Sequence, residues 1–347
     1  MSRSISIDIL KAASIFGVVF IHSSNLLGCE SAVSEMFQSL FRFAVPCFVV
    51  IWAYFVEKSL IVKNRQQQVQ YLTRRFMHLF VVFMLWSTLY FLISVNWATL
   101  TPVKLITTYF SGFGWAGQYY FIILFQLLVL FPLTRWIYKR QNLTIIVVAV
   151  LVVLYFVCAY VRLPSLIDSL GYRVFIYWIP YVFVGIWLAR TQTSGRVLNS
   201  TDKSENKKSM PAKRLFVSKW WLLTIFFIPA ESWLMKCGGL FNDLNEYVRP
   251  AVLFVSVVIS VFAIQNNIIQ HNPIVFIGSR TMTIFVTNSL VIYSLKALFA
   301  SVGLQLVQHC GIFMEITFPF ISASLVLGIC LLINKAIKLV RLDKILI

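Results

Sequence analysis

Long runs of apolar residues, separated by short polar segments, dominate the chain. A helix of about 20 apolar residues crosses the roughly 30 Å hydrocarbon core of a bilayer. The pattern therefore predicts membrane-spanning helices, the ninth of which is approached through Pro273, Gly278 and Arg280. The ten predicted helices cover approximately Ile7–Leu27, Met36–Val56, Phe76–Val95, Tyr119–Ile137, Leu143–Val161, Tyr172–Ala189, Trp220–Cys237, Val248–Ile264, Thr281–Phe299 and Ile312–Ile333.

The composition narrows the class of protein. Of 347 residues, 59% are hydrophobic and 12% are charged, and the mean hydropathy is +0.83. Since soluble proteins carry about 25% charged residues, this chain lacks the polar side chains that a soluble globule needs at its surface. The same values exclude disordered and collagen-like chains. We expect an all-α, polytopic membrane protein whose single transmembrane domain covers residues 1–347.

Lys and Arg are divided unevenly between alternate loops. The chain has 30 Lys and Arg against 12 Asp and Glu, a formal net charge of +18. Most basic residues lie near the two termini and in the second, fourth and sixth loops. The opposite loops hold only Lys104, Arg162, Arg173, Lys236 and Arg249. The positive-inside rule places both termini in the cytoplasm. Because the basic residues lie between apolar runs, the charge indicates topology and not nucleic-acid binding.

Two segments interrupt the regular alternation of apolar runs and short loops. Residues 191–219 are rich in Ser, Thr, Asn and Lys and predict a flexible cytoplasmic linker. Residues 96–118 form the longest outer loop and predict a half-buried or re-entrant piece. The sequence has no metal-ligand spacing, C-x-x-C pair or Gly-rich phosphate loop, so we expect neither a metal nor a bound cofactor.

Charged side chains inside the first predicted helix are costly in a membrane and indicate function. Lys11 and His22 are eleven positions apart. At about 100° and 1.5 Å per residue they share one face, about 16 Å apart along the axis. Ile15 and Val18 lie between them on the same stripe, and Asp8 precedes Lys11 by one turn, where it can pair with it. The structural alternative is an interfacial ion pair and a histidine satisfied by a neighbouring helix.

Two further ionisable residues are predicted at nearly the depth of His22. Arg42 and Glu231 both lie about six residues from the outer ends of their predicted helices, the second and the seventh. If these helices meet the first, the three groups line a polar cavity that opens outward. An ion pair between Arg42 and Glu231 is the structural alternative.

The polar positions in the first two helices resemble those of the integral-membrane acyltransferase 3 family. The family hallmark is an Arg or Lys separated from a His by ten residues, which Lys11 and His22 match. The segment Arg42–Phe48 is similar to the family pattern Arg-x-x-Val-Pro-x-Phe. Further similarity covers Tyr71–Phe76, Tyr119–Leu133 and Gly278–Ile292, and so extends through most of the chain.

The chain departs from the family pattern at three positions. Tyr119 stands where the family usually has Trp, and in the late Ile-Tyr-Leu-x-His segment Phe285 replaces the Tyr and Asn288 replaces the His. A catalytic histidine is therefore not expected in that segment. Tyr119 and Asn288 are candidate substrate-binding residues; Tyr119 is alternatively an aromatic side chain of the membrane interface.

The resemblance implies transfer of an acyl group, usually acetyl from acetyl-CoA, to a hydroxyl of a cell-surface or lipid-linked glycan such as O-antigen. It further implies a multi-pass protein of the bacterial inner membrane, in contact with the lipid bilayer. The donor is cytoplasmic and many acceptors are extracytoplasmic. Acyl-CoA is then a co-substrate rather than a bound cofactor.

Each polar residue of the first helix has an expected role in this transfer. Lys11, with Asp8, holds the phosphates of the donor, and Ile15 and Val18 line a slot for its thin arm. His22 removes a proton from the sugar hydroxyl, or alternatively acts as the nucleophile and forms an acyl-imidazole.

The second and seventh helices supply the remaining expected roles. Arg42 stabilises charge on the thioester oxygen or holds an acidic acceptor, and Glu231 orients His22. The rival interpretation is an exporter of a polysaccharide or lipid-linked sugar, which intramembrane charges would also suit. Against it, the sequence shows no inverted repeat and no paired Gly/Pro-broken helices.

Overall fold

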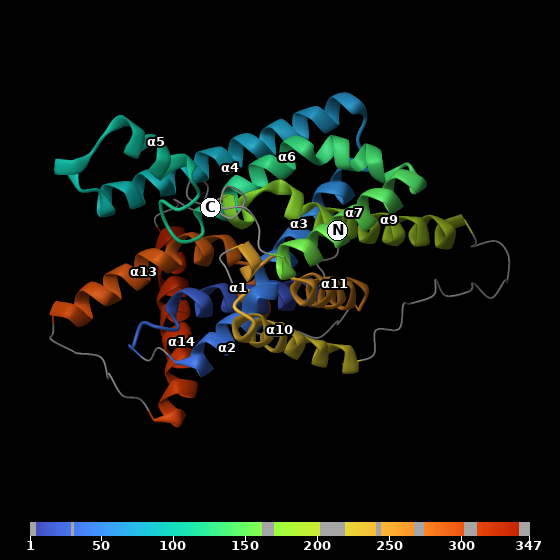
Figure 1. Cartoon of the computed structure of the whole chain (residues 1–347). Helices are drawn as coiled ribbons and strands as arrows, with labels where there is room; N and C mark the ends of the chain where they lie inside the picture. Colours follow the sequence, from blue (N-terminus) through green and yellow to red (C-terminus); the bar gives the residue numbers. More distant parts are fainter. Residues whose placement is uncertain are drawn as a thin grey trace.

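The computed structural model describes residues 5–28, 31–161, 170–201, 219–240, 244–266, 274–301 and 311–339 (Figure 1). Within these ranges every regular element is helical. The α-helices are α1 (Ile5–Ser23), α2 (Ala32–Leu40), α3 (Ala44–Leu60), α4 (Arg65–Ser94), α5 (Pro102–Phe110), α6 (Gln118–Tyr138), α7 (Gln141–Tyr160), α9 (Ile179–Thr201), α10 (Phe227–Cys237), α11 (Pro250–Gln265), α12 (Ile274–Gly278), α13 (Thr281–Ser301) and α14 (Ile312–Leu339). Most of the predicted linker, residues 202–218, lies outside the described residues.

Seven helical segments of the described chain are long and apolar enough to cross a membrane. They are α1, α2 with α3, α4, α6, α7, α13 and α14. The other three predicted spans differ: α11 has 16 residues, α10 has 11 and follows the 3-10 helix Lys219–Phe226, and α9 begins only after two short 3-10 turns. The count of ten and the cytoplasmic placement of both termini remain predictions.

The second predicted span, Met36–Val56, is broken at the position of Arg42. α2 ends at Leu40, the 3-10 turn Phe41–Phe43 follows, and α3 begins at Ala44. Pro46 has no N–H, so the carbonyl of Arg42 lacks its usual helical partner four residues later. Arg42 therefore stands in a turn between two helices, which corrects its predicted place inside one continuous helix.

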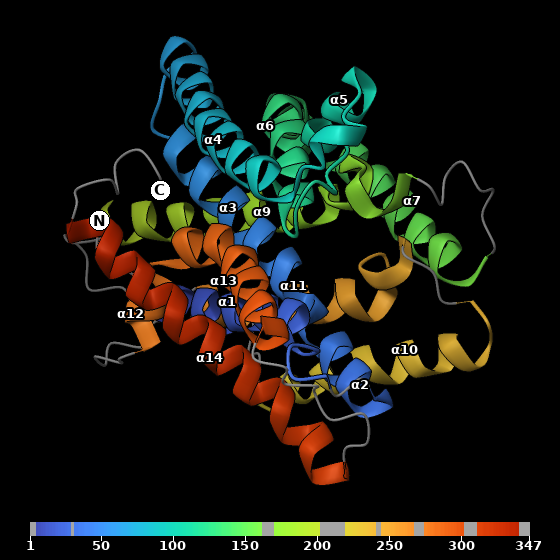
Figure 2. The same cartoon turned by 90° about the vertical axis from the view of Figure 1, so that its left-hand side faces the viewer.

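Helix α1 lies inside the bundle, in contact with α3, α12, α13 and α14 (Figure 2). Glycines allow two of these close approaches. A Cβ atom at Gly278 of α12 would lie 2.0 Å from the carbonyl oxygen of Asp8, and one at Gly17 would lie 3.0 Å from the ring of Phe41. Between Lys11 and His22 the face of α1 that these two residues share is covered by protein, since Ile15 is fully buried and Val18 is 2% exposed.

Helices α3 and α9 pack along each other beside α6. A Cβ atom at Gly185 of α9 would lie 2.6 Å from that of Ala53, so glycine is required at this crossing. Near the C-terminal end of α3, the fully buried carboxylate of Glu57 pairs with Arg135 of α6 and Arg190 of α9, each at 2.8 Å. A buried acid is tolerated when it is paired, so this cluster links three helices.

Within the predicted outer loop, residues 96–118, the buried residues among those described begin only at Gly112. Helix α5 within it has no buried residue, whereas the following turn places Trp115 and Gln118 in the interior. The Gln118 amide donates to the carbonyls of Thr108 and Tyr109, both at 3.0 Å. Gly117 adopts a φ of 99°, a left-handed conformation that favours glycine, just before α6 begins.

Candidate active site

The end of α1 near Asp8 and Lys11 carries an ion pair, and after the predicted topology we call it the inner end. The Lys11 Nζ lies 2.9 Å from Asp8 Oδ1, which confirms the predicted pairing. The Lys11 side chain keeps 23% of its surface exposed and the Asp8 side chain 6%. An (i, i+3) pair of this kind contributes only a few tenths of a kcal/mol, so an incoming anion can displace it.

A second cation stands on the segment that packs against the inner end. Gly278 touches the backbone of Asp8, and Arg280 follows it by two residues. The Arg280 Nε donates to Asn334 Oδ1 at 3.0 Å, and the buried Asn334 donates in turn to Thr283 Oγ1 at 2.7 Å. In the sequence, Arg280 stands out only as an interruption before the ninth predicted helix, because no neighbouring residue indicates these partners.

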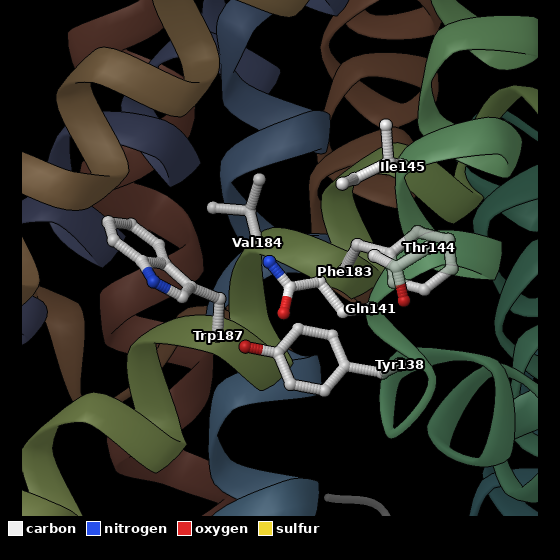
Figure 3. Close-up of a pocket in the computed structure, with 7 residues that line it drawn as sticks. All are labelled: Tyr138, Gln141, Thr144, Ile145, Phe183, Val184 and Trp187. Carbon is white, nitrogen blue, oxygen red and sulfur yellow. The ribbon is translucent and has the colours of Figure 1, made fainter.

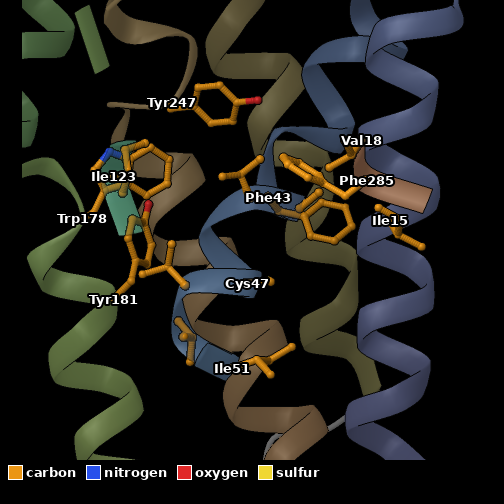
Figure 4. Close-up of a cluster of buried hydrophobic side chains, with 14 of the residues drawn as sticks. Ile15, Val18, Phe43, Cys47, Ile51, Ile123, Trp178, Tyr181, Tyr247 and Phe285 are labelled. Atoms are coloured by element: carbon orange, nitrogen blue, oxygen red, sulfur yellow. The ribbon is translucent and has the colours of Figure 1, made fainter. Parts of the chain in front are cut away.

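The stripe between the two ends of α1 is buried and apolar. Ile15 is fully buried and Val18 is 2% exposed. Both belong to the same buried cluster as Phe43 and Phe285, which lie near them in Figure 4. Passage of a donor arm along this stripe, as the sequence predicted, therefore requires these side chains to move apart.

The opposite end of α1 carries His22 in its last turn, and we call it the outer end. His22 is partly buried and interacts electrostatically with Arg42. Arg42 forms an ion pair with Glu246 at 2.8 Å, and its guanidinium carbon lies 5.0 Å from the centre of the Tyr247 ring. Of the three predicted polar groups, His22 and Arg42 interact electrostatically, and the turn that carries Arg42 packs against α1.

Tyr119 lies in an aromatic group that supports this arrangement. Its hydroxyl lies 3.1 Å from that of Tyr247, and the ring of Tyr172 stands 5.1 Å from that of Tyr119 and 4.8 Å from that of Tyr247. Tyr119 is 5% exposed, so it is an interior residue rather than an aromatic at the lipid interface. We call His22, Arg42, Glu246, Tyr247, Tyr119 and Tyr172 the outer cluster.

Glu231 does not form the ion pair with Arg42 that the sequence offered as an alternative; Glu246 does. The Glu231 carboxylate accepts a hydrogen bond from the Tyr160 hydroxyl at 2.7 Å and another from the Ala251 N–H at 3.1 Å, at the first turn of α11. It borders a cavity of about 420 Å³ together with Tyr160 and Met235. Its predicted role in orienting His22 remains a prediction without a contact among the described residues.

Asn288 lies in the interior of the bundle, 1% exposed. Its amide donates to two carbonyls of its own helix, Ile284 at 3.2 Å and Phe285 at 2.6 Å. Ser289 donates to the Asn288 side-chain oxygen at 3.3 Å and to the Ala116 carbonyl at 3.1 Å. These contacts hold α13 against the turn before α6, and the substrate-binding role of Asn288 remains a prediction.

A separate groove, of about 500 Å³, lies between α6, α7 and α9 (Figure 3). None of the residues predicted for the site lines it. It is bordered by Tyr138, Gln141, Thr144, Ile145, Phe183, Val184 and Trp187. The described residues contain no group of three His, Cys, Asp or Glu side chains that could hold a metal ion.

These features define a helical, multi-pass membrane protein with a charged cluster at each end of one enclosed helix. The profile of the acyltransferase 3 family, described as an acyltransferase domain, matches residues 4–335. The chain therefore belongs to this family of membrane acyltransferases. Comparison with curated proteins found no match, and neither did comparison with solved structures.

Besides Tyr172, which the sequence indicated only as the start of the sixth predicted helix, the residues of the outer cluster that were not predicted for the site are Glu246 and Tyr247. They stand in a short predicted loop before α11, where no periodic pattern indicates their orientation. The one available signal was a Glu-Tyr pair three residues before Pro250, the kind of polar loop end that also occurs without function. Only the folded chain brings them to Arg42.

Proposed function

We propose that the protein is an O-acyltransferase of the bacterial inner membrane that moves an acyl group, typically acetyl, from acyl-CoA to a hydroxyl of a cell-surface or lipid-linked glycan such as O-antigen. The family supports acyl transfer. The observation that supports the proposal is that Lys11 and His22 lie toward opposite ends of one helix, α1, and that the turn carrying Arg42 packs against this helix, where Arg42 interacts electrostatically with His22.

At the inner end, a cation with a weak local partner suits the phosphates of coenzyme A. The Lys11 ammonium can exchange Asp8 for a phosphate oxygen, because the (i, i+3) pair stabilises the helix only slightly. Arg280, held by Asn334, supplies a guanidinium on the adjoining segment. The two cations favour an anionic donor at this end.

At the outer end, His22 acts on the acceptor hydroxyl. As general base it takes the hydroxyl proton while the oxygen attacks the thioester carbonyl; the C–S bond then breaks and the imidazolium returns the proton to the departing thiolate. As nucleophile it first takes the acyl group on a ring nitrogen and releases the thiol, and the acyl-imidazole then passes the group to the sugar oxygen. Arg42 stabilises the negative charge on the carbonyl oxygen in both routes.

The test is an acylation assay on the intact protein in membranes. Membranes that contain the protein, radiolabelled acetyl-CoA and the surface glycans of the producing cell should give labelled glycan, detected after extraction. His22→Ala should abolish the label at normal protein level. His78→Ala, which removes an exposed histidine of α4, should leave it unchanged. Movement of unmodified glycan across the membrane, with no label transferred, would favour an exporter instead.

A further inference from the structure

The charge of Arg42 is already balanced within the protein. The Glu246 carboxylate pairs with it at 2.8 Å. The Glu246 side chain keeps 25% of its surface exposed and the Arg42 side chain 13%. The Tyr247 ring lies beside the guanidinium, at 5.0 Å. An acidic acceptor that used Arg42 would have to displace a carboxylate already held in this position.

A second Arg and a second Glu adjoin this pair. Arg249 is 1% exposed and interacts electrostatically with Glu231, Glu246 and Arg42. Two guanidinium groups are thus matched by two carboxylates in one network. Arg173 interacts electrostatically with Tyr172; it also donates to the carbonyls of Leu170 and Ser111, and its guanidinium lies over Phe113 at 4.0 Å.

A permanent additional negative charge, such as a carboxylate or phosphate on the acceptor, is unfavourable in such a network, whereas the charge on the thioester oxygen develops only during the reaction. Charges in a poorly solvated region interact more strongly than in water, and a buried carboxylate without its own cation is costly. A sugar hydroxyl needs no countercharge, and the aromatic rings of the outer cluster suit the apolar faces of a neutral ring.

We propose that Glu246 makes the site select an uncharged sugar as acceptor and disfavour a sugar that carries a carboxylate or a phosphate. The proposal rests on the acyltransferase function above and specifies its substrate class. Glu246 then acts as a specificity-determining residue, because it pairs with Arg42, the cation to which an acidic sugar would otherwise bind.

The experiment compares the sugars that receive the label. Membranes with the wild-type protein are incubated with labelled acetyl-CoA and the producing cell's glycans; oligosaccharides released by mild acid are separated by anion exchange. Tandem mass spectrometry identifies the acylated residue. The label should reside on neutral sugars in at least about tenfold excess over acidic sugars, because placing like charges together is strongly unfavourable.

Variants connect this preference to Glu246. Glu246→Gln removes one carboxylate, so acidic sugars should gain label. The ratio of label on neutral sugars to label on acidic sugars should fall about tenfold. Glu246→Asp keeps the charge and should retain the neutral preference, which separates specificity from a folding defect. Glu35→Gln removes an exposed carboxylate that pairs with Lys236 and should change nothing.

Each outcome has one meaning. Wild-type label mainly on acidic sugars, or a ratio that Glu246→Gln leaves unchanged, overturns the selection of neutral sugars while acyl transfer stands. Absence of label from every sugar with the wild-type protein would instead count against the proposed function itself.

Discussion

The two ends of α1 are built in different ways. At the inner end, Lys11 pairs with Asp8 of the same helix and remains partly exposed. At the outer end, His22 interacts electrostatically with Arg42. Arg42 is held by an ion pair with Glu246 and by the ring of Tyr247, both from a distant segment of the chain. A local, exposed pair exchanges partners easily, whereas a cluster fixed by tertiary contacts holds its groups in place. The inner end therefore suits binding and release, and the outer end suits a reaction that needs fixed geometry.

The largest effect of a substitution is expected at the outer end. Arg42→Gln removes the group that stabilises the charged carbonyl oxygen, so kcat should fall by about 10²–10³-fold. Arg42→Lys keeps the charge but loses the planar fork, and it should recover only part of this loss. Steady-state kinetics with acetyl-CoA check both variants. If the Gln variant retained wild-type kcat, the outer end would hold no fixed catalytic cation.

The next largest effect is expected on stability, where α12 packs against α1. In Gly278→Ala the new Cβ atom would lie 2.0 Å from the Asp8 carbonyl oxygen, so α12 must move away from the inner end. We expect a loss of about 1–3 kcal/mol in the free energy of unfolding. Gly328→Ala on α14, where nothing lies within 4 Å, is the matched control and should not lower stability, since alanine is favoured over glycine inside a helix. Thermal unfolding in detergent compares the two; equal melting temperatures would argue against the close contact of α12 with α1.

At the inner end, the expected effect is on binding rather than on chemistry. Lys11→Ala should raise the KM for acetyl-CoA by roughly tenfold with a small change in kcat, because one charge–phosphate contact is lost. Lys11→Arg should preserve most of the affinity, since charge is what the phosphates require. A fall in kcat with unchanged KM would assign Lys11 to the reaction and remove the contrast between the two ends.

The smallest effect is expected at Glu231. Glu231→Gln keeps the shape of the side chain that accepts from Tyr160 and from the Ala251 N–H, so activity should fall only a few-fold. Measurement of kcat/KM beside wild type tests this. A loss as large as that of His22→Ala would restore Glu231 to the orienting role that the sequence analysis gave it.

The features that the sequence predicted correctly are local ones. The Asp8–Lys11 pair and the shared face of Lys11 and His22 follow from helical spacing alone, and the apolar runs predict where most long helices lie. The break at Arg42 was also within reach, because Pro46 stands inside the predicted span. The turn at Arg42 was not predicted, because the hydropathy of the segment does not show that Pro46 lacks a backbone N–H.

The partners that site residues find on other helices could not be predicted, because these pairings depend on how distant helices pack. Nothing in the sequence around Glu246 distinguishes it from Glu231 as the partner of Arg42. The same holds for Asn334, whose contact with Arg280 joins α14 to the segment before α13. Tertiary packing decides pairings of this kind, whereas sequence periodicity indicates only which residues lie on the same face of a helix.

The central claim is that α1 joins a donor site on one side of the membrane to acyl transfer on the other. It is tested most directly in proteoliposomes sorted so that the predicted cytoplasmic linker faces the lumen, with glycan acceptor outside and labelled acetyl-CoA either sealed inside or added outside. The account predicts labelled external glycan only with acetyl-CoA inside, and none with His22→Ala. Labelling that requires donor and acceptor on the same side would contradict it.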